Sequence, residues 1–188
     1  YWGQKGHYGV AILSKKKPIE VQKGFIKDTA QDQKRFIQAK FKWGKKSITI
    51  MNGYFPQGEN RSHETKFPKK IKYYADLKKH IKKTQKTEDN LIVMGDFNVA
   101  PSPLDIGIGE INAKRWLKEG KTAFLPEEID MWNSIKKLGF IDSWREQNPD
   151  EGSVYSWFDY RSRMFDDIPK RGLRIDHIMI SENLIPAM

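Results

Sequence analysis

Short apolar runs recur along the chain, and their spacing predicts a mixture of strands and helices. Runs that alternate with polar residues, or that are wholly apolar over four to seven positions, favour strands. The predicted strands cover residues 8–14, 36–41, 47–52, 91–94, 155–158 and 174–180. The run at 91–94, Leu-Ile-Val-Met, has no polar position, a pattern typical of a strand that is buried on both faces.

Three other segments carry apolar residues at helical spacing and predict helices at 68–86, 112–119 and 126–138. In the first of these, four apolar residues would share one face while the lysines between them face solvent: Ile71, Tyr74, Leu77 and Ile81. Residues 44–46 suit a hairpin turn, and residues 53–66 are rich in loop-forming types. The sequence therefore predicts an α/β protein with several paired strands.

Composition excludes several function classes. The 188 residues are enough for a buried core without disulfides, and the chain has no cysteine, which excludes a disulfide scaffold, a thiolate zinc site and a cysteine nucleophile. No apolar run approaches the ~20 residues of a membrane helix. The four histidines lack metal-ligand spacing, and there is neither a glycine-rich phosphate loop nor a serine nucleophile elbow. We expect a cytoplasmic protein without a signal peptide. Because the sequence opens at Tyr1, we also expect a processed, trimmed or incomplete chain.

Charge is distributed unevenly along the chain. The net charge is +10, yet residues 1–90 carry 22 basic and 8 acidic residues while residues 91–188 carry 12 basic and 16 acidic residues. A positive surface attracts phosphate-bearing partners, and an acidic subset can hold a divalent cation. A lysine-rich, solvated surface with no partner explains the same charge equally well. Charge alone therefore does not decide between nucleic-acid binding and such a surface.

Asp96 and Asn98 are the strongest candidates for chemistry. They follow the buried run at 91–94, and residues two apart point to the same side of a strand. A carboxylate there can accept a proton from an attacking water, and an amide can steady charge on a phosphoryl oxygen. An Asp and an Asn that only form a turn after a strand are the competing interpretation.

Three further positions are weaker candidates when each is considered alone. Tyr54 also follows a strand, with Gln57 nearby, and either contacts a phosphate or only covers the edge of the core. Asp176 lies in an apolar run and requires a partner, either a functional one or a buried arginine such as Arg174. The aromatic segment at 155–161 either stacks on sugars and bases or packs in the core.

Taken together, these segments resemble the exonuclease III family, the bacterial apurinic/apyrimidinic endonucleases of the endonuclease–exonuclease–phosphatase superfamily. The Gly-Asp-Phe-Asn motif at 95–98 is shared by the whole superfamily. The Asp-Ile-Gly-Ile-Gly segment at 105–109 and the Trp-Phe-Asp-Tyr-Arg segment at 157–161 are more specific to exonuclease III. Further matching stretches follow in the family's order, at 3–11, 52–59, 124–128 and 171–176.

The resemblance implies roles for individual residues. Asp96 would be the general acid/base and touch the metal together with Asn98, which would also stabilise the pentacovalent phosphate. Tyr54 would lie at the scissile phosphate, and Asp176 would be a buried carboxylate that orients the catalytic histidine. Mg²⁺ is the implied cofactor, with Mn²⁺ as an alternative. The DNA-binding residues would be Gln57, Asn60, Arg61, Lys66, Trp157, Arg161, Leu173, Arg174 and Ile175.

The same resemblance implies a fold and a function. The fold would be a four-layer α/β/β/α sandwich, with residues 1–188 as one domain that lacks the family's outermost segments at both ends. The function would be Mg²⁺-dependent hydrolysis of double-stranded DNA, 5′ to abasic sites and 3′→5′ from ends, by a metal-activated water in a monomeric protein. An inactive DNA-binding fragment, or a phosphoesterase acting on RNA or small phosphoesters, are the alternatives.

Overall fold

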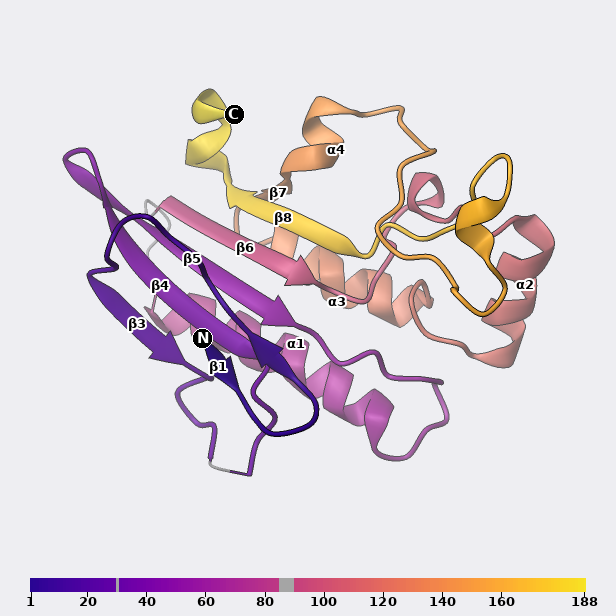
Figure 1. Cartoon of the computed structure of the whole chain (residues 1–188), viewed down its shortest axis with the longest axis horizontal. Helices are drawn as coiled ribbons and strands as arrows, with labels where there is room; N and C mark the ends of the chain where they lie inside the picture. The colour runs from indigo at the N-terminus through magenta and orange to yellow at the C-terminus, as the bar shows by residue number, and fades with distance from the viewer. Residues whose placement is uncertain (30, 85–89) are drawn as a thin grey trace.

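A six-stranded mixed sheet forms the centre of the molecule (Figure 1). The computed structural model describes residues 1–29, 31–84 and 90–188. The strands lie in the order β3-β4-β5-β6-β8-β7. Their bounds, in that order, are Glu20–Lys23, Phe36–Trp43, Lys46–Tyr54, Asn90–Asp96, Asp176–Ser181 and Phe140–Asp142. β5 and β6 are parallel and β8 runs against them, so the ends of β5 and β6 lie beside the start of β8.

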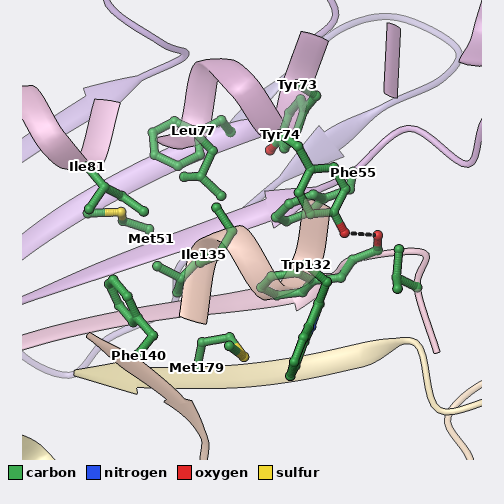
Figure 2. Close-up of a cluster of buried hydrophobic side chains, with 14 of the residues drawn as sticks. Met51, Phe55, Tyr73, Tyr74, Leu77, Ile81, Trp132, Ile135, Phe140 and Met179 are labelled. Carbon is green, nitrogen blue, oxygen red and sulfur yellow. Dashed lines mark hydrogen bonds between the residues drawn. The ribbon is translucent and has the colours of Figure 1, made fainter. Parts of the chain in front are cut away.

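Two helices cover one face of this sheet. α1 (Lys66–Thr84) connects the parallel strands β5 and β6, and α3 (Pro126–Lys136) packs beside it, behind the sheet in Figure 1. Side chains of both helices and of the strands that they cover form the main apolar core, in which Leu77 and Ile135 lie close to Met51 (Figure 2). The burial of these side chains is the main favourable contribution to folding.

The N-terminal segment lies on the opposite face of the sheet. β1 (Trp2–Gly3) and β2 (Gly9–Val10) form a small antiparallel ribbon in front of β4 and β5 (Figure 1). The Asn52 amide of β5 donates to the carbonyl of Ala11 at 2.8 Å, which ties this segment to the sheet.

The remaining elements gather at the end of the sheet where β5 and β6 finish, or beside β8. α2 (Glu110–Glu119) and a 3₁₀ turn at Met164–Asp166 belong to the first group, with a second apolar cluster beneath them that includes Ile108, Phe124 and Leu173. α4 (Ser143–Gln147) and 3₁₀ turns at Pro103–Asp105 and Glu182–Ala187 complete the fold.

The predicted α/β class is confirmed, and six of the predicted elements are correct apart from their ends: the strands at 36–41, 47–52, 91–94 and 174–180 and the helices at 112–119 and 126–138. The helix predicted at 68–86 begins at Lys66, and its last two predicted residues lie outside the described part of the chain. Of the predicted four layers, the described residues show the helix layer and the six-stranded sheet, with the two-stranded ribbon on the other face.

Two strand predictions are wrong in extent. The strand predicted at 8–14 is reduced to Gly9–Val10, and residues 155–158 form only a single bridge between Trp157 and Leu173. Trp157 of the second segment packs against the apolar cluster, and the rings of Tyr155 and Phe158 contact each other, instead of pairing in a ladder. The structure also contains three strands that were not predicted: β1 in the ribbon, and β3 and β7 at the edges of the six-stranded sheet. In the described residues, no helix is long and apolar enough to cross a membrane.

Candidate active site

Tyr54, Asp96 and Asp176 form a single row across three neighbouring strands. Tyr54 is the last residue of β5 and pairs with Asp96, the last residue of β6, which in turn pairs with Asp176, the first residue of β8. Because paired residues of adjacent strands project to the same face, the three side chains share the face opposite α1 and α3. The strand ends that the sequence singled out separately therefore meet at one place.

Asn98 lies next to this row and holds Asp96 in position. Its backbone N–H donates to one carboxylate oxygen of Asp96 and its side-chain amide to the other, both at 2.9 Å. The same amide also donates to the carbonyl of Phe55 at 2.9 Å. Asn98 is buried and has a φ of +52°, an uncommon conformation that asparagine tolerates better than most residues.

The environment raises the pKa of Asp96 to about 6. Burial is the largest cause, and the like charge of Asp176 adds to it; the hydrogen bonds from Asn98 and the charge of Lys70 act in the opposite direction. A carboxyl group with a pKa close to neutral is well matched to accepting and returning a proton.

A glycine before Asp96 is required by the close approach of β5. Gly95 has a φ of +128°, and a Cβ at this position would lie 2.1 Å from the carbonyl oxygen of Gly53. Any other residue at position 95 would push the ends of β5 and β6 apart. This explains physically why glycine precedes the Asp-x-Asn pattern here.

Arg35 contacts the ring and the backbone of Tyr54, an interaction that the sequence did not indicate. Its guanidinium lies 4.4 Å from the centre of the Tyr54 ring and 3.9 Å from that of Tyr8, and it donates to the carbonyl of Tyr54 at 3.0 Å. The backbone N–H of Tyr54 donates to the carbonyl of Arg35 at 2.8 Å. An arginine beside an apolar strand carries no sequence pattern that would have revealed this contact.

Asp176 and Arg174 differ from what the sequence suggested. Asp176 is exposed at the start of β8, so the expectation of a buried carboxylate is wrong for this structure. Arg174 is buried and binds Asp105 and Asp142 at 2.7 Å and 2.6 Å, so the alternative pairing of Arg174 with Asp176 is wrong as well. The Arg174 guanidinium is therefore paired with two buried carboxylates and does not face solvent.

Asp142 and His177 complete this internal network. His177 follows Asp176 but points to the helix-covered face, where its ring lies 3.3 Å from a carboxylate oxygen of Asp142 and 2.7 Å from the carbonyl oxygen of Val99. Hydrogen bonds and charge from His177 and Arg174 hold the pKa of Asp142 well below its usual range, although burial opposes them. The network anchors β7, β8 and the chain after Asn98 to one another.

Arg174, which was expected to contact DNA, is buried in this network and is not accessible to a duplex. The other residues expected to contact DNA divide into two groups. In the loop after β5, Gln57 and Arg61 are exposed, and Arg61 forms a bidentate pair with Glu127 at 2.5 and 2.8 Å. Asn60 donates to the carbonyl of Glu119 at 2.6 Å, and Lys66 pairs with Glu59.

The second group lies around the other apolar cluster. Leu173 and Ile175 are buried there, Trp157 is partly exposed beside them, and Arg161 is exposed in the loop that follows. The carbonyl of Ile175 accepts the backbone N–H of Phe97 at 2.9 Å, so this group adjoins the Asp96–Asn98 turn.

The donor set of the row suits a hard divalent cation. The Asp96 carboxylate accepts two hydrogen bonds from Asn98, which leaves lone pairs on its oxygens, and Asp176 places a second carboxylate on the same face. Mg²⁺ is commonly bound by one or two carboxylates together with phosphate oxygens and waters. Among the described residues, however, no three histidine, cysteine or acidic side chains gather closely enough to hold a metal ion by themselves.

The chain is similar in sequence to known proteins. A sequence model of the endonuclease/exonuclease/phosphatase family matches residues 1–187. The chain belongs to this family. Exodeoxyribonuclease III of Haemophilus influenzae is 51% identical to it over 182 residues, which cover 97% of the chain and 67% of that protein.

Solved structures of similar proteins superpose on most of the chain. A 3′-5′ exonuclease from Neisseria meningitidis matches with a TM-score of 0.74 and 31% identity, over 91% of the chain and 60% of that protein. An AP endonuclease from Archaeoglobus fulgidus matches with a TM-score of 0.75 and 28% identity, over 89% of the chain and 60% of that protein. The chain thus spans about two thirds of the length of these relatives.

Proposed function

We propose that this chain acts as a magnesium-dependent DNA repair nuclease. The enzyme would hydrolyse phosphodiesters of double-stranded DNA 5′ to abasic sites and would also remove nucleotides 3′→5′ from ends. The observation that carries the proposal is the row of Tyr54, Asp96 and Asp176, with Asn98 bonded to both oxygens of the Asp96 carboxylate. Similarity to exodeoxyribonuclease III supports the substrate class.

In this proposal each residue of the row has a separate task. Asp96 accepts a proton from the attacking water, and its pKa of about 6 suits that exchange near neutral pH. Asn98 keeps the carboxylate oriented and steadies negative charge on the phosphoryl oxygens. Tyr54, fixed by Arg35, donates a hydrogen bond to the scissile phosphate.

Mg²⁺, which Asp96 and Asn98 would hold with the Asp176 carboxylate on the same face, would supply charge neutralisation at the phosphate and lower the pKa of a bound water. Gln57, Asn60, Arg61 and Lys66 would meet the duplex on one side of the row and Trp157 and Arg161 on the other. Leu173 and Ile175 would wall the pocket for the base-less sugar. We further infer that residues 1–188 form one domain, since the main core joins side chains from Phe36 to Met179, and that the protein acts as a monomer.

A substrate panel tests this function. The protein as its gene encodes it is incubated, with Mg²⁺ and with EDTA, with an abasic duplex, an undamaged duplex, an RNA of the same sequence and an inositol phosphate. We expect cleavage of both duplexes in Mg²⁺ alone, with the abasic duplex cut 5′ to the lesion. Binding of duplex without cleavage, or faster turnover of RNA or inositol phosphate, would contradict the proposal.

A further inference from the structure

Lys70 of α1 is a fully buried ammonium group with three acceptors. Its side chain has no exposed surface. Nζ donates to the Glu128 carboxylate, to the carbonyl of Asn98 at 2.8 Å and to the carbonyl of Gln57 at 3.2 Å. A lysine ammonium has three N–H donors, so this environment uses all of them.

Two of the acceptors lie in the loops that leave the catalytic strands. Gln57 follows Tyr54 by three residues, and Asn98 follows Asp96 by two. The Nζ atom of Lys70 therefore bonds both to the loop that follows β5 and to the turn that follows β6. The carbonyl of Asn98 belongs to a residue in the left-handed region, so its backbone is held in a conformation that costs free energy without outside support.

Glu128 extends the connection to α3. Its second carboxylate oxygen accepts the backbone N–H groups of Ala123 and Leu125, at 2.8 and 2.9 Å, in the segment that enters α3. The negative charge lies in the first turn of α3, where the helix dipole favours it. Lys70 and Glu128 are thus bonded to each other, and each is also bonded to two backbone groups.

A neighbouring residue of α1 acts on the same loop. Tyr74, one helical turn after Lys70, donates its hydroxyl to the carbonyl of Phe97 at 2.8 Å, the dashed line in Figure 2. Two successive carbonyls of the turn that carries Asp96 and Asn98 are therefore held by α1. The helix supports the site from the face opposite the catalytic row.

Global stability is a poor explanation for a buried ion pair. Removing two charges from water costs several kcal/mol, and well-packed uncharged replacements for such pairs are often neutral or stabilising. A lysine that is completely buried is rare in proteins. An uncharged pair could not reproduce the simultaneous hydrogen bonds to the carbonyls of Gln57 and Asn98.

We propose that Lys70 is a positioning residue that fixes the spacing between the Tyr54 loop and the Asp96–Asn98 turn, with Glu128 as its neutralising partner. The proposal rests on the proposed nuclease function, because the spacing matters only if these residues act on one substrate. Loss of the connection would let the two loops move relative to each other. Misplacement of reacting groups by about 1 Å can cost ~100-fold in rate.

The decisive variant is Lys70→Met combined with Glu128→Gln. The double change removes both charges together and keeps an oxygen acceptor for the N–H groups of Ala123 and Leu125, so no buried charge is left unpaired. The matched control is Lys72→Met combined with Asp76→Asn, which removes an ion pair with a 2.5 Å contact from the outer surface of the same helix. Both are made in the protein as its gene encodes it.

We expect the Lys70/Glu128 variant to unfold at a temperature close to wild type, with kcat on abasic duplex lowered by about tenfold or more and KM changed by less than about threefold. Amide hydrogen exchange should quicken in residues 55–60 and 97–100 and stay unchanged in β4 and β5. The Lys72/Asp76 control should match wild type in kcat and in exchange. Wild-type kcat together with wild-type exchange in the Lys70/Glu128 variant would overturn the positioning role.

The two proposals fail in different ways. If the wild-type protein cleaves no DNA, the nuclease function is wrong, and hydrogen exchange in the two loops still decides whether Lys70 holds them together. If the wild-type protein cleaves DNA and the Lys70/Glu128 variant is simply unfolded, as shown by its circular dichroism, the pair is structural and the positioning role is wrong.

Discussion

At the scale of the residue, Asp96 is subject to opposing influences that set its protonation. Burial and the charge of Asp176 favour the neutral carboxyl, whereas the two donors of Asn98 and the ammonium of Lys70 favour the carboxylate. The balance places its pKa at about 6, above the usual 3.8. At neutral pH the ionised Asp96 therefore lowers the free energy of unfolding. A bound cation or substrate would change this contribution.

This balance predicts a pH-dependent effect of Asp96→Asn on stability. A raised folded-state pKa means that the favourable contribution of Asp96 is complete below pH 4 and is lost as the pH rises through about 6. The free energy of unfolding of Asp96→Asn, relative to wild type in EDTA, should therefore increase by up to ~3 kcal/mol between pH 4 and 7.5.

Urea unfolding of both proteins at several pH values measures this difference. The loss of hydrogen bonds in the variant is the same at each pH and cancels from the change. A difference between variant and wild type that stays constant over this range would show that the pKa of Asp96 is not raised.

Sequence reasoning at this scale found strand ends but not their surroundings. Tyr54, Asp96 and Asn98 were identifiable because each follows an apolar run, and a buried run ending in polar groups is a local signal. The supporting contacts of Arg35 and Lys70 join residues that are far apart in the sequence, by 19 positions in Arg35–Tyr54 and by 28 in Lys70–Asn98. No local pattern records such pairs.

At the scale of the element, α1 shows how apolar spacing predicts burial. Leu77 is 1% exposed and Ile81 is buried, as their spacing predicts, whereas Ile71 is 45% exposed although it belongs to the same predicted face. The core around Leu77 contains aromatic side chains from both α1 and the sheet (Figure 2). Lys70, next in the chain to Ile71, is the buried residue of that turn.

Leu77→Ala and Ile71→Ala form a matched pair that tests this distribution. Leu77→Ala leaves a cavity between α1 and the sheet and should lower the free energy of unfolding by about 2–5 kcal/mol. Ile71→Ala removes an exposed side chain from a helix and should change it by about 0.5 kcal/mol or less. Thermal or urea unfolding measures both, and equal losses from the two changes would contradict the packing of α1.

The two strands of the six-stranded sheet that the sequence missed have a common cause. β3, Glu-Val-Gln-Lys, is an edge strand with one apolar residue, and β7 has only three residues at the other edge. Edge strands face solvent on one side, so periodicity is weak there. The opposite error, at 155–158, arose because an aromatic run can pack in a cluster without pairing as a strand.

At the scale of the whole molecule, the charge of the first 90 residues is only partly directed toward the candidate site. Lys79, Lys82 and Lys83 are exposed on α1, which lies behind the sheet (Figure 1). The candidate row of Tyr54, Asp96 and Asp176 lies on the other face of the sheet. A net charge of +10 raises the local concentration of duplex around the whole molecule. Site selection then depends on the loops that flank the row.

The arrangement that matters for function is the convergence of β5, β6 and β8. The carboxyl ends of two parallel strands and the start of an antiparallel one bring Tyr54, Asp96 and Asp176 together, although they are as much as 122 positions apart in the chain. Sequence pattern placed each residue on a strand, but strand order and register, which decide the convergence, follow from packing of the whole sheet.

The most direct measurement compares single-turnover cleavage of an abasic duplex in Mg²⁺ by wild type and by Asp96→Asn, both as the gene encodes the protein, with binding of the duplex measured in parallel. Asp96→Asn should bind the duplex with similar affinity and cleave it at least ~100-fold more slowly, since it cannot accept the proton. Cleavage by Asp96→Asn at the wild-type rate would contradict the central claim that this row carries out the reaction.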